Sequence, residues 1–107
     1  MRELIWPSIT EQVGLLNLQA TQHPDAFWVI SPSLQDKLPS ISADLLFPVH
    51  NADASTLHEL QRRVADLNPS VVIAAGGGKT LDLAKLAART IQPDSPDRWR
   101  EKQAMHS

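Results

Sequence analysis

The chain has 107 residues, of which 42% are hydrophobic and 21% are charged, and this suffices for one small globular domain with a modest core. The formal net charge of −2 gives no electrostatic basis for a nucleic-acid partner. The chain has no cysteine, which excludes disulfides and thiolate metal sites, and no apolar run of the roughly 20 residues that span a bilayer, so we expect a cytoplasmic protein without a membrane partner.

Strand-like and helix-like segments alternate along the chain. In chain order, the first half predicts a short strand over 4–6, a helix over 9–21, a buried strand over 26–30, a short helix over 34–38 and a strand over 45–49. The second half predicts an amphipathic helix over 56–67, a strand over 70–75 and a helix over 80–91. The alternation predicts an α/β fold, a partial three-layer Rossmann-like parallel sheet with about three strands.

Two details concern the ends of these elements. Ser8 with Glu11 and Thr56 with Glu59 have capping-box spacing, so each pair is expected to begin a helix. We expect the core to comprise about residues 1–92, followed by a loop and a polar C-terminal tail over 93–107. Within this tail, the tripeptide 95–97 (Ser-Pro-Asp) has the composition of a helix start.

The segment from Val71 to Lys85 carries most of the functional information. A β-branched apolar run leads into three glycines, Gly76, Gly77 and Gly78, and a helical pattern follows them. Glycine lets the backbone approach an anion closely, and free N–H groups at a helix start face such an anion with the helix dipole behind them. The order therefore predicts a cradle for the phosphates of a nucleotide.

Two other glycine loops fit this segment poorly. The dinucleotide fingerprint G-x-G-x-x-G needs a third glycine three residues after the second, and Leu81 stands there instead. The P-loop G-x-x-x-x-G-K-[ST] fits at its end, from Gly78 to Thr80, but its first glycine would have to replace Ile73 inside the strand. The connection is thus too short to wrap a triphosphate, and no later apolar strand ends in an Asp that would hold Mg²⁺.

A third pattern, G-G-G-x-x-x-D-x-A-K, matches residues 76–85 at every fixed position. It resembles the iron-containing alcohol dehydrogenase superfamily, and the form Gly-Gly-Gly-Lys-Thr-Leu-Asp is most similar to glycerol dehydrogenase. Less specific similarities extend over 29–33, 56–71 and 96–99. The resemblance implies the N-terminal half of a dehydroquinate synthase-like nucleotide-binding domain, with NAD or NADP as the cofactor.

The resemblance implies a set of cofactor-binding residues, namely Gly76, Gly77, Gly78, Thr80, Asp82, Lys85 and Ser31. The glycines would present backbone N–H groups to the pyrophosphate. Thr80 at the helix start could add a hydroxyl donor, and Asp82 in the first turn would be stabilised by the helix dipole. Lys85 follows one turn later on a similar face, so we expect an ion pair with Asp82. The alternative is a strand-to-helix turn that binds nothing.

Ser31 occupies the end of the first nucleotide-binding strand, where the family usually has an acidic residue that binds the adenosine ribose. A serine lacks the carboxylate that would repel a 2′-phosphate, so NADP is compatible with this position, or cofactor affinity is weakened. The alternative for Ser31 and Ser33 is that both are ordinary turn residues.

The remaining conspicuous residues indicate structure rather than chemistry. Trp28 lies in an apolar run and is expected in the core, and the pair Arg62–Arg63 is expected on a solvated helix face. The four histidines show no metal-ligand spacing. The sequence therefore indicates no catalytic residue and no metal ligand.

The family's metal ligands, for iron or zinc, lie in a helical C-terminal domain that we do not expect in this chain. A hydride transferase must hold nicotinamide and alcohol together. The resemblance therefore implies a truncated or fragmentary oxidoreductase chain that is inactive alone and binds a dinucleotide weakly or undetectably, unless a second polypeptide completes it. The alternatives are a piece of a dehydroquinate synthase-like or glycerol-1-phosphate dehydrogenase-like enzyme, and a non-catalytic nucleotide-binding or interaction module.

Overall fold

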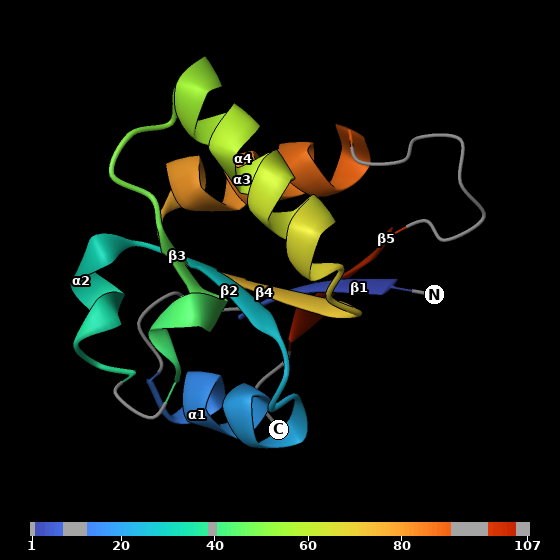
Figure 1. Ribbon diagram of the computed structural model, residues 1–107. Coiled ribbons are helices and arrows are strands. Elements are labelled where there is room, and N and C mark those ends of the chain that lie inside the picture. Colours follow the sequence, from blue (N-terminus) through green and yellow to red (C-terminus); the bar gives the residue numbers. More distant parts are fainter. Residues whose placement is uncertain (1, 8–12, 39–40, 91–98, 105–107) are drawn as a thin grey trace.

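The computed structural model describes residues 2–7, 13–38, 41–90 and 99–104. Within these ranges the chain forms five strands and four α-helices, with a short 3₁₀ helix before the third strand (Figure 1). The strands are β1 (Arg2–Pro7), β2 (Phe27–Ile30), β3 (Leu46–Pro48), β4 (Val71–Ala75) and β5 (Trp99–Ala104). The helices are α1 (Val13–Gln22), α2 (Pro32–Gln35), α3 (Ala54–Leu67) and α4 (Gly78–Thr90), and the 3₁₀ helix is η1 (Ala43–Leu45).

The described strands form one parallel sheet in the order β3-β2-β4-β1-β5. Parallel neighbours need crossover connections, and these are nearly always right-handed, so connections that move in opposite directions along the sheet cover opposite faces. Figure 1 shows α3 and α4 on one side of the sheet and α1 and α2 on the other. The expected α/β class with helices on both faces of a parallel sheet is confirmed.

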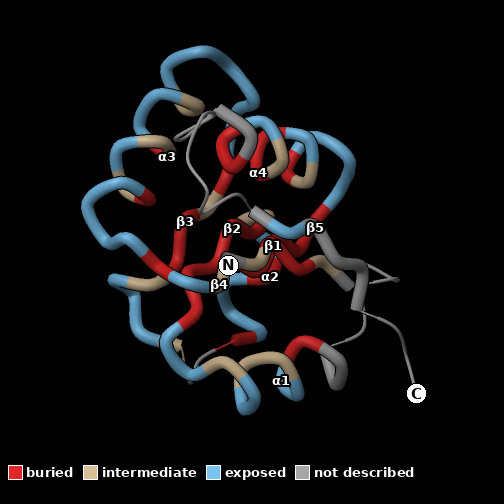
Figure 2. Tube along the Cα trace, turned by 90° about the vertical axis from the view of Figure 1, so that its right-hand side faces the viewer, coloured by how far each residue is buried: buried red, intermediate tan, exposed pale blue. Residues whose placement is uncertain are grey.

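Each central strand contributes to two cores because its side chains alternate across the sheet. Phe27 and Val29 of β2 pack with α3 and α4, whereas Trp28 and Ile30 pack with α1 and α2. Figure 2 shows β2 buried along its length and β4 buried after its first residue. Burial on both faces explains why the two strands have unbroken apolar sequences rather than alternating ones.

The sheet is larger than the roughly three strands expected from the sequence. β1 lies in its interior between β4 and β5, and all six residues of β1 pair with the six of β5. The segment 93–107, expected as loop and tail, thus contains an edge strand, while the expected helix start at 95–97 lies outside the described residues. Edge strands tolerate charged residues, which is why the polarity of Trp99–Ala104 does not reveal a strand.

The helix α3 begins earlier than its sequence predicts, and the prediction that Thr56 and Glu59 form a capping box at its start is wrong. Asp53 is the N-cap, and its Oδ1 accepts a hydrogen bond from the Thr56 N–H over 2.8 Å. The helix ends as expected at Asn68, which adopts the left-handed conformation with φ of 49°. The other expected capping box, at Ser8, lies outside the described residues.

The Asp53 cap makes the stability of the protein depend on pH. The hydrogen bond from the Thr56 backbone lowers the pKa of the Asp53 carboxyl below its ordinary value. The carboxylate therefore stabilises the fold above the unfolded-state pKa, and this stabilisation is lost as the pH falls through the lower folded-state pKa. We expect Asp53→Ala to lower the urea midpoint at pH 7, with the difference shrinking below about pH 4. Asp53→Asn keeps a capping side chain that does not titrate, so it should lose little stability at either pH. If the stability lost in Asp53→Ala were the same at both pH values, this role of the carboxylate would be contradicted.

Candidate functional site

The strands β2 and β4 are neighbours whose carboxyl ends lie level with each other. Ile30 pairs with Ala75 at the last position, and the Ser31 N–H donates to the Ala75 carbonyl oxygen over 2.9 Å. Since Ser31 follows β2 and Gly76 follows β4, this register brings the serine and the glycine loop together. The expectation that the loop lies at the carboxyl end of the strand 70–75 is confirmed.

The chain leaves these two strand ends in opposite directions. From β2 it runs through α2 and η1 to β3, and from β4 it runs through α4 toward β5 near the other edge of the sheet. The two connections cover opposite faces (Figure 1). In open parallel sheets, ligands bind beside the carboxyl ends of the strands at such a reversal of strand order. The glycine loop therefore lies at the topological switch point of the sheet.

Gly76 is the glycine that the protein's own packing requires. It is buried, and its φ of 155° is a backbone conformation that other residues rarely adopt. A Cβ atom at this position would collide with the Ser31 Oγ and would lie 2.9 Å from both the Cβ and the Oγ1 of Thr80. The first glycine thus permits a close approach between the end of β2, the loop and the first turn of α4.

Ser31 joins these three parts through its hydroxyl group. The Ser31 Oγ lies 3.1 Å from the Thr80 Oγ1 and accepts a hydrogen bond from the Gly77 N–H over 3.3 Å. Thr80 is only 4% exposed, so Ser31 satisfies a buried hydroxyl. Neither the ribose nor the plain turn interpretation of Ser31 includes this contact. No local sequence signal could reveal it, because it joins residues 49 positions apart.

Gly77 and Gly78 face open space. Both are exposed, and apart from the adjacent residues and the backbone of α4, no atom of the described protein lies within 4 Å of the place where a Cβ would stand on either residue. The Gly77 carbonyl oxygen accepts from the Leu81 N–H over 3.1 Å, so α4 starts directly after Gly77. The N–H groups of Gly78, Lys79 and Thr80 then have no acceptor within the helix. They lie at the positive end of the helix dipole, which is the arrangement that binds anions.

Asp82 and Lys85 take no part in the hydrogen bonds of the loop. The helix α4 begins at Gly78 rather than at Thr80, so Asp82 lies beyond the first turn and gains less from the dipole than expected. Within the described structure, the Lys85 Nζ lies 4.3 Å from the centre of the Trp6 ring and forms no ion pair with Asp82. The expected Asp82–Lys85 pair is thus replaced by a cation–π contact.

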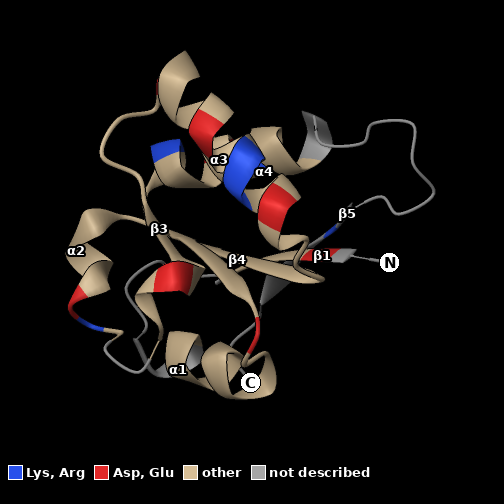
Figure 3. Cartoon of the chain, in the orientation of Figure 1, with Lys and Arg blue, Asp and Glu red and all other residues tan. Residues whose placement is uncertain are grey.

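The tryptophan and the two arginines that the sequence analysis names lie in the core or on the helix α3, away from the glycine loop. Trp28 is buried, as expected, and Arg62 is exposed, but Arg63 donates to the Asp44 carbonyl oxygen over 2.9 Å and lies 5.5 Å from the centre of the Phe27 ring. Figure 3 shows acidic and basic residues mixed along α3. Among the described residues, no three His, Asp or Glu side chains form a group that could hold a metal ion. None of the described helices combines the length and apolarity needed to cross a membrane.

Comparisons with protein-family models, with curated proteins and with solved structures find no match to this chain. The geometry at the switch point is therefore the basis for assigning a function.

Proposed function

We propose that this chain is the nucleotide-binding part of an NAD(P)-dependent dehydrogenase of the iron-containing alcohol dehydrogenase type, which acts on a small alcohol or polyol. The observation that carries the proposal is the position of the glycine loop. It follows β4 at the switch point of a parallel sheet, with exposed helix N–H groups beside two unobstructed glycines.

The residues at the loop fit the pyrophosphate of a dinucleotide. Gly77 and Gly78 leave the space beside the backbone open, so a phosphate oxygen could closely approach the free N–H groups of Gly78, Lys79 and Thr80, while the Gly77 N–H donates to Ser31. Ser31 and Thr80 hold the loop from behind through their hydroxyl groups, and this fixes the direction of the donors. A bound nicotinamide supplies the site of hydride transfer, and the loop contributes binding and orientation.

The length of the loop favours a dinucleotide over a nucleoside triphosphate. β4 ends at Ala75 and α4 begins at Gly78, so only two residues connect them. A P-loop that cradles a triphosphate needs a longer connection, and Ile73, where its first glycine would stand, is buried inside β4. Lys79 is exposed and has no long loop to direct it toward a γ-phosphate.

The surroundings of Ser31 are compatible with both NAD and NADP. The end of β2 presents no carboxylate that would repel a 2′-phosphate, and the Ser31 hydroxyl is engaged with Gly77 and Thr80. Hydride transfer also requires groups that hold the alcohol against the nicotinamide. We assign no such group, and no metal ligand, to the described residues, so another segment or polypeptide would complete the site.

An NMR titration of the ¹⁵N-labelled chain tests the proposal. NADH and NADPH should shift the backbone amide signals of residues 77–80, with half-saturation in the millimolar range, which is about −4 kcal/mol at 1 mM. Adenosine, which lacks the phosphates, should leave these signals unchanged. Residues on α1, at the far face of the sheet, provide the internal control.

Two outcomes would defeat the proposal. If ATP–Mg²⁺ bound more tightly than NADH, and Lys79→Ala abolished that binding, the loop would be a P-loop. If no phosphate compound shifted residues 77–80 at millimolar concentration, the loop would be a structural turn and the chain a module of another kind.

A further inference from the structure

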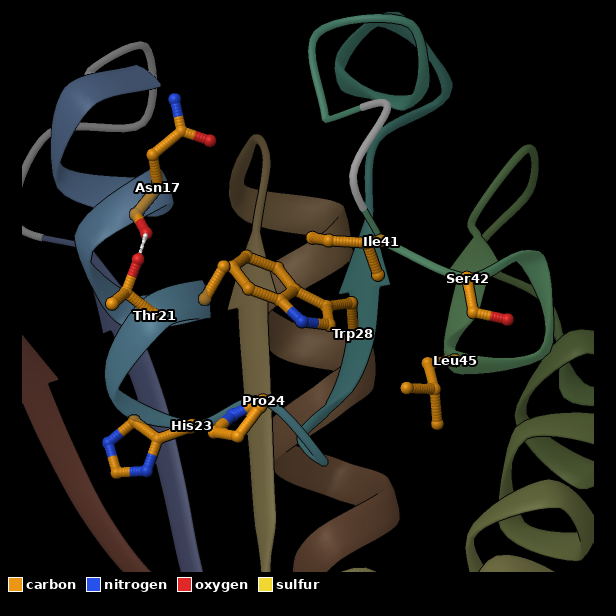
Figure 4. A pocket seen from close by; sticks show the side chains of 9 residues that line it. Asn17, Thr21, His23, Pro24, Trp28, Ile41, Ser42 and Leu45 are labelled. Atoms are coloured by element: carbon orange, nitrogen blue, oxygen red, sulfur yellow. Dashed lines mark hydrogen bonds between the residues drawn. The ribbon is translucent and has the colours of Figure 1, made fainter.

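A cavity of about 510 Å³ lies beside Trp28, on the face of the sheet that α1 and α2 cover (Figure 4). Its lining comes from α1, from the turn after α1, from the first half of β2 and from the chain around η1. These are the amino ends of β2 and β3, whereas the glycine loop follows the carboxyl end of β4. The volume falls within the roughly 300–1,000 Å³ of small-molecule sites. The cavity is thus separate from the proposed cofactor site.

Trp28 contributes an indole N–H group to this cavity for which the described residues provide no acceptor. Its side chain is 1% exposed, and the indole N–H donates to none of the described residues. Figure 4 shows the ring nitrogen on the side of the indole that faces Pro24 and Leu45. Buried indole N–H groups usually have a hydrogen-bond partner, and an unpaired one costs about 1–3 kcal/mol. An acceptor atom of a ligand in the cavity would supply that partner.

The remaining lining residues divide into an apolar part and a polar part. Ala20, Pro24, Ile41 and Leu45 give the cavity apolar surface. Asn17, Thr21, His23 and Ser42 add amide, hydroxyl and imidazole groups. This mixture of apolar surface with a few polar groups is typical of sites for small organic molecules.

The charged residues in and near the cavity lining indicate the charge of the ligand that it can bind. Among the described residues that line the cavity there is no Asp, Glu, Lys or Arg, and α1 has no charged residue (Figure 3). The nearest charged residues in sequence, Asp25 beside Pro24 and Asp44 beside Leu45, are acidic and exposed. An anion would therefore meet repulsion, and a cation would lose its hydration without gaining a partner inside the cavity.

We propose that this cavity binds a small neutral molecule that has a flat apolar body and a carbonyl oxygen or ring nitrogen as acceptor. The acceptor takes the hydrogen bond of the Trp28 indole N–H, and the body packs against Pro24, Ile41 and Leu45. This site is independent of the glycine loop, so it stands whether or not the chain binds a dinucleotide.

Three matched probes of the same size test the proposal, namely 2-naphthamide, 2-naphthoate and 2-naphthylmethylammonium. The chain has three tryptophans, and Trp28→Phe identifies the indole N–H signal of Trp28 in the NMR spectrum. We expect 2-naphthamide to shift that signal saturably, with half-saturation below about 1 mM. The two charged probes should shift it at least tenfold more weakly at equal concentration.

Ser42→Phe should block the cavity and raise the half-saturation concentration of 2-naphthamide at least tenfold. Ser42 is exposed and its side chain makes no capping hydrogen bond, so the fold does not depend on it. Ser55→Phe, at an exposed position on α3, is the matched control and should leave binding unchanged. The proposal is overturned if the Trp28 signal does not move, if it moves equally with all three probes, or if Ser42→Phe and Ser55→Phe behave alike.

Discussion

Gly76→Ala should destabilise the protein by roughly 3 kcal/mol, a large fraction of the about 5–15 kcal/mol that typically separates folded from unfolded states. Two costs combine at this position. The φ of 155° strains an alanine backbone by about 1–3 kcal/mol, and the new Cβ meets the Ser31 Oγ and the Thr80 side chain, which adds an overpacking cost of about 1–3 kcal/mol. Urea denaturation measures the loss, and the midpoint should fall by at least about 1 M.

The neighbouring glycines provide the matched controls for this result. Gly77→Ala and Gly78→Ala introduce a Cβ that, apart from adjacent residues and the backbone of α4, has no described protein atom within 4 Å, so each should change stability by less than about 1 kcal/mol. In a Ser31→Gly background, Gly76→Ala should cost less than in the wild type, because the hydroxyl that obstructs the Cβ is gone. Equal stability of the three alanine variants would show that the loop is not held together as described.

Gly77→Ala should weaken the binding of NADH at least tenfold, about 1.4 kcal/mol, while leaving the fold intact. In the proposed complex the pyrophosphate takes the space beside this glycine that the protein leaves open, so a Cβ there would displace it. The initial slope of the NADH titration, followed at the amide signals of residues 78–80, should fall by the same factor. The stability of the variant, measured in parallel, separates lost binding from lost structure.

Lys79→Ala is the control for charge at the same loop. Lys79 is exposed, and removing its ammonium group takes away only a screened attraction, so NADH affinity should change less than about threefold. A larger loss with Lys79→Ala than with Gly77→Ala would mean that the side chain, rather than the backbone, holds the phosphates. That result would favour a P-loop type of site.

The apolar pattern of the sequence predicts the centre of the fold well. The unbroken runs at β2 and β4 indicate strands buried on both faces, and the spacing of Leu60 and Val64 indicates the buried face of α3. β5 escapes the same reasoning because an edge strand needs no apolar alternation. The sequence predicts the N-cap of α3 at the wrong residue because Asp53 and Thr56 both suit an N-cap. Only the course of the backbone decides between them.

In the candidate site, adjacent residues predict some features, whereas others depend on contacts between segments that are distant in the chain. The glycine loop follows from local sequence, since glycines between a strand and a helix have few other uses. The role of Ser31 depends on the pairing of β2 with β4, because that pairing places the Ser31 hydroxyl against Gly77 and Thr80. A strand order cannot be read from residue spacing, so the sequence could suggest a ribose contact or a turn but not the hydrogen bonds that shape the loop.

The interior position of β1 has a consequence for how this protein is made. β1 precedes the other described strands in the chain, yet its two neighbours in the sheet are β4, which begins at Val71, and β5, which begins at Trp99. Joining segments so distant in the chain costs loop-closure entropy before any pairing is gained, and such topologies fold slowly. Leu4 and Ile5, which are buried in the finished sheet, therefore have no strand to pair with until β4 and β5 have been synthesised. During that interval the first strand is available to chaperones and to other nascent chains.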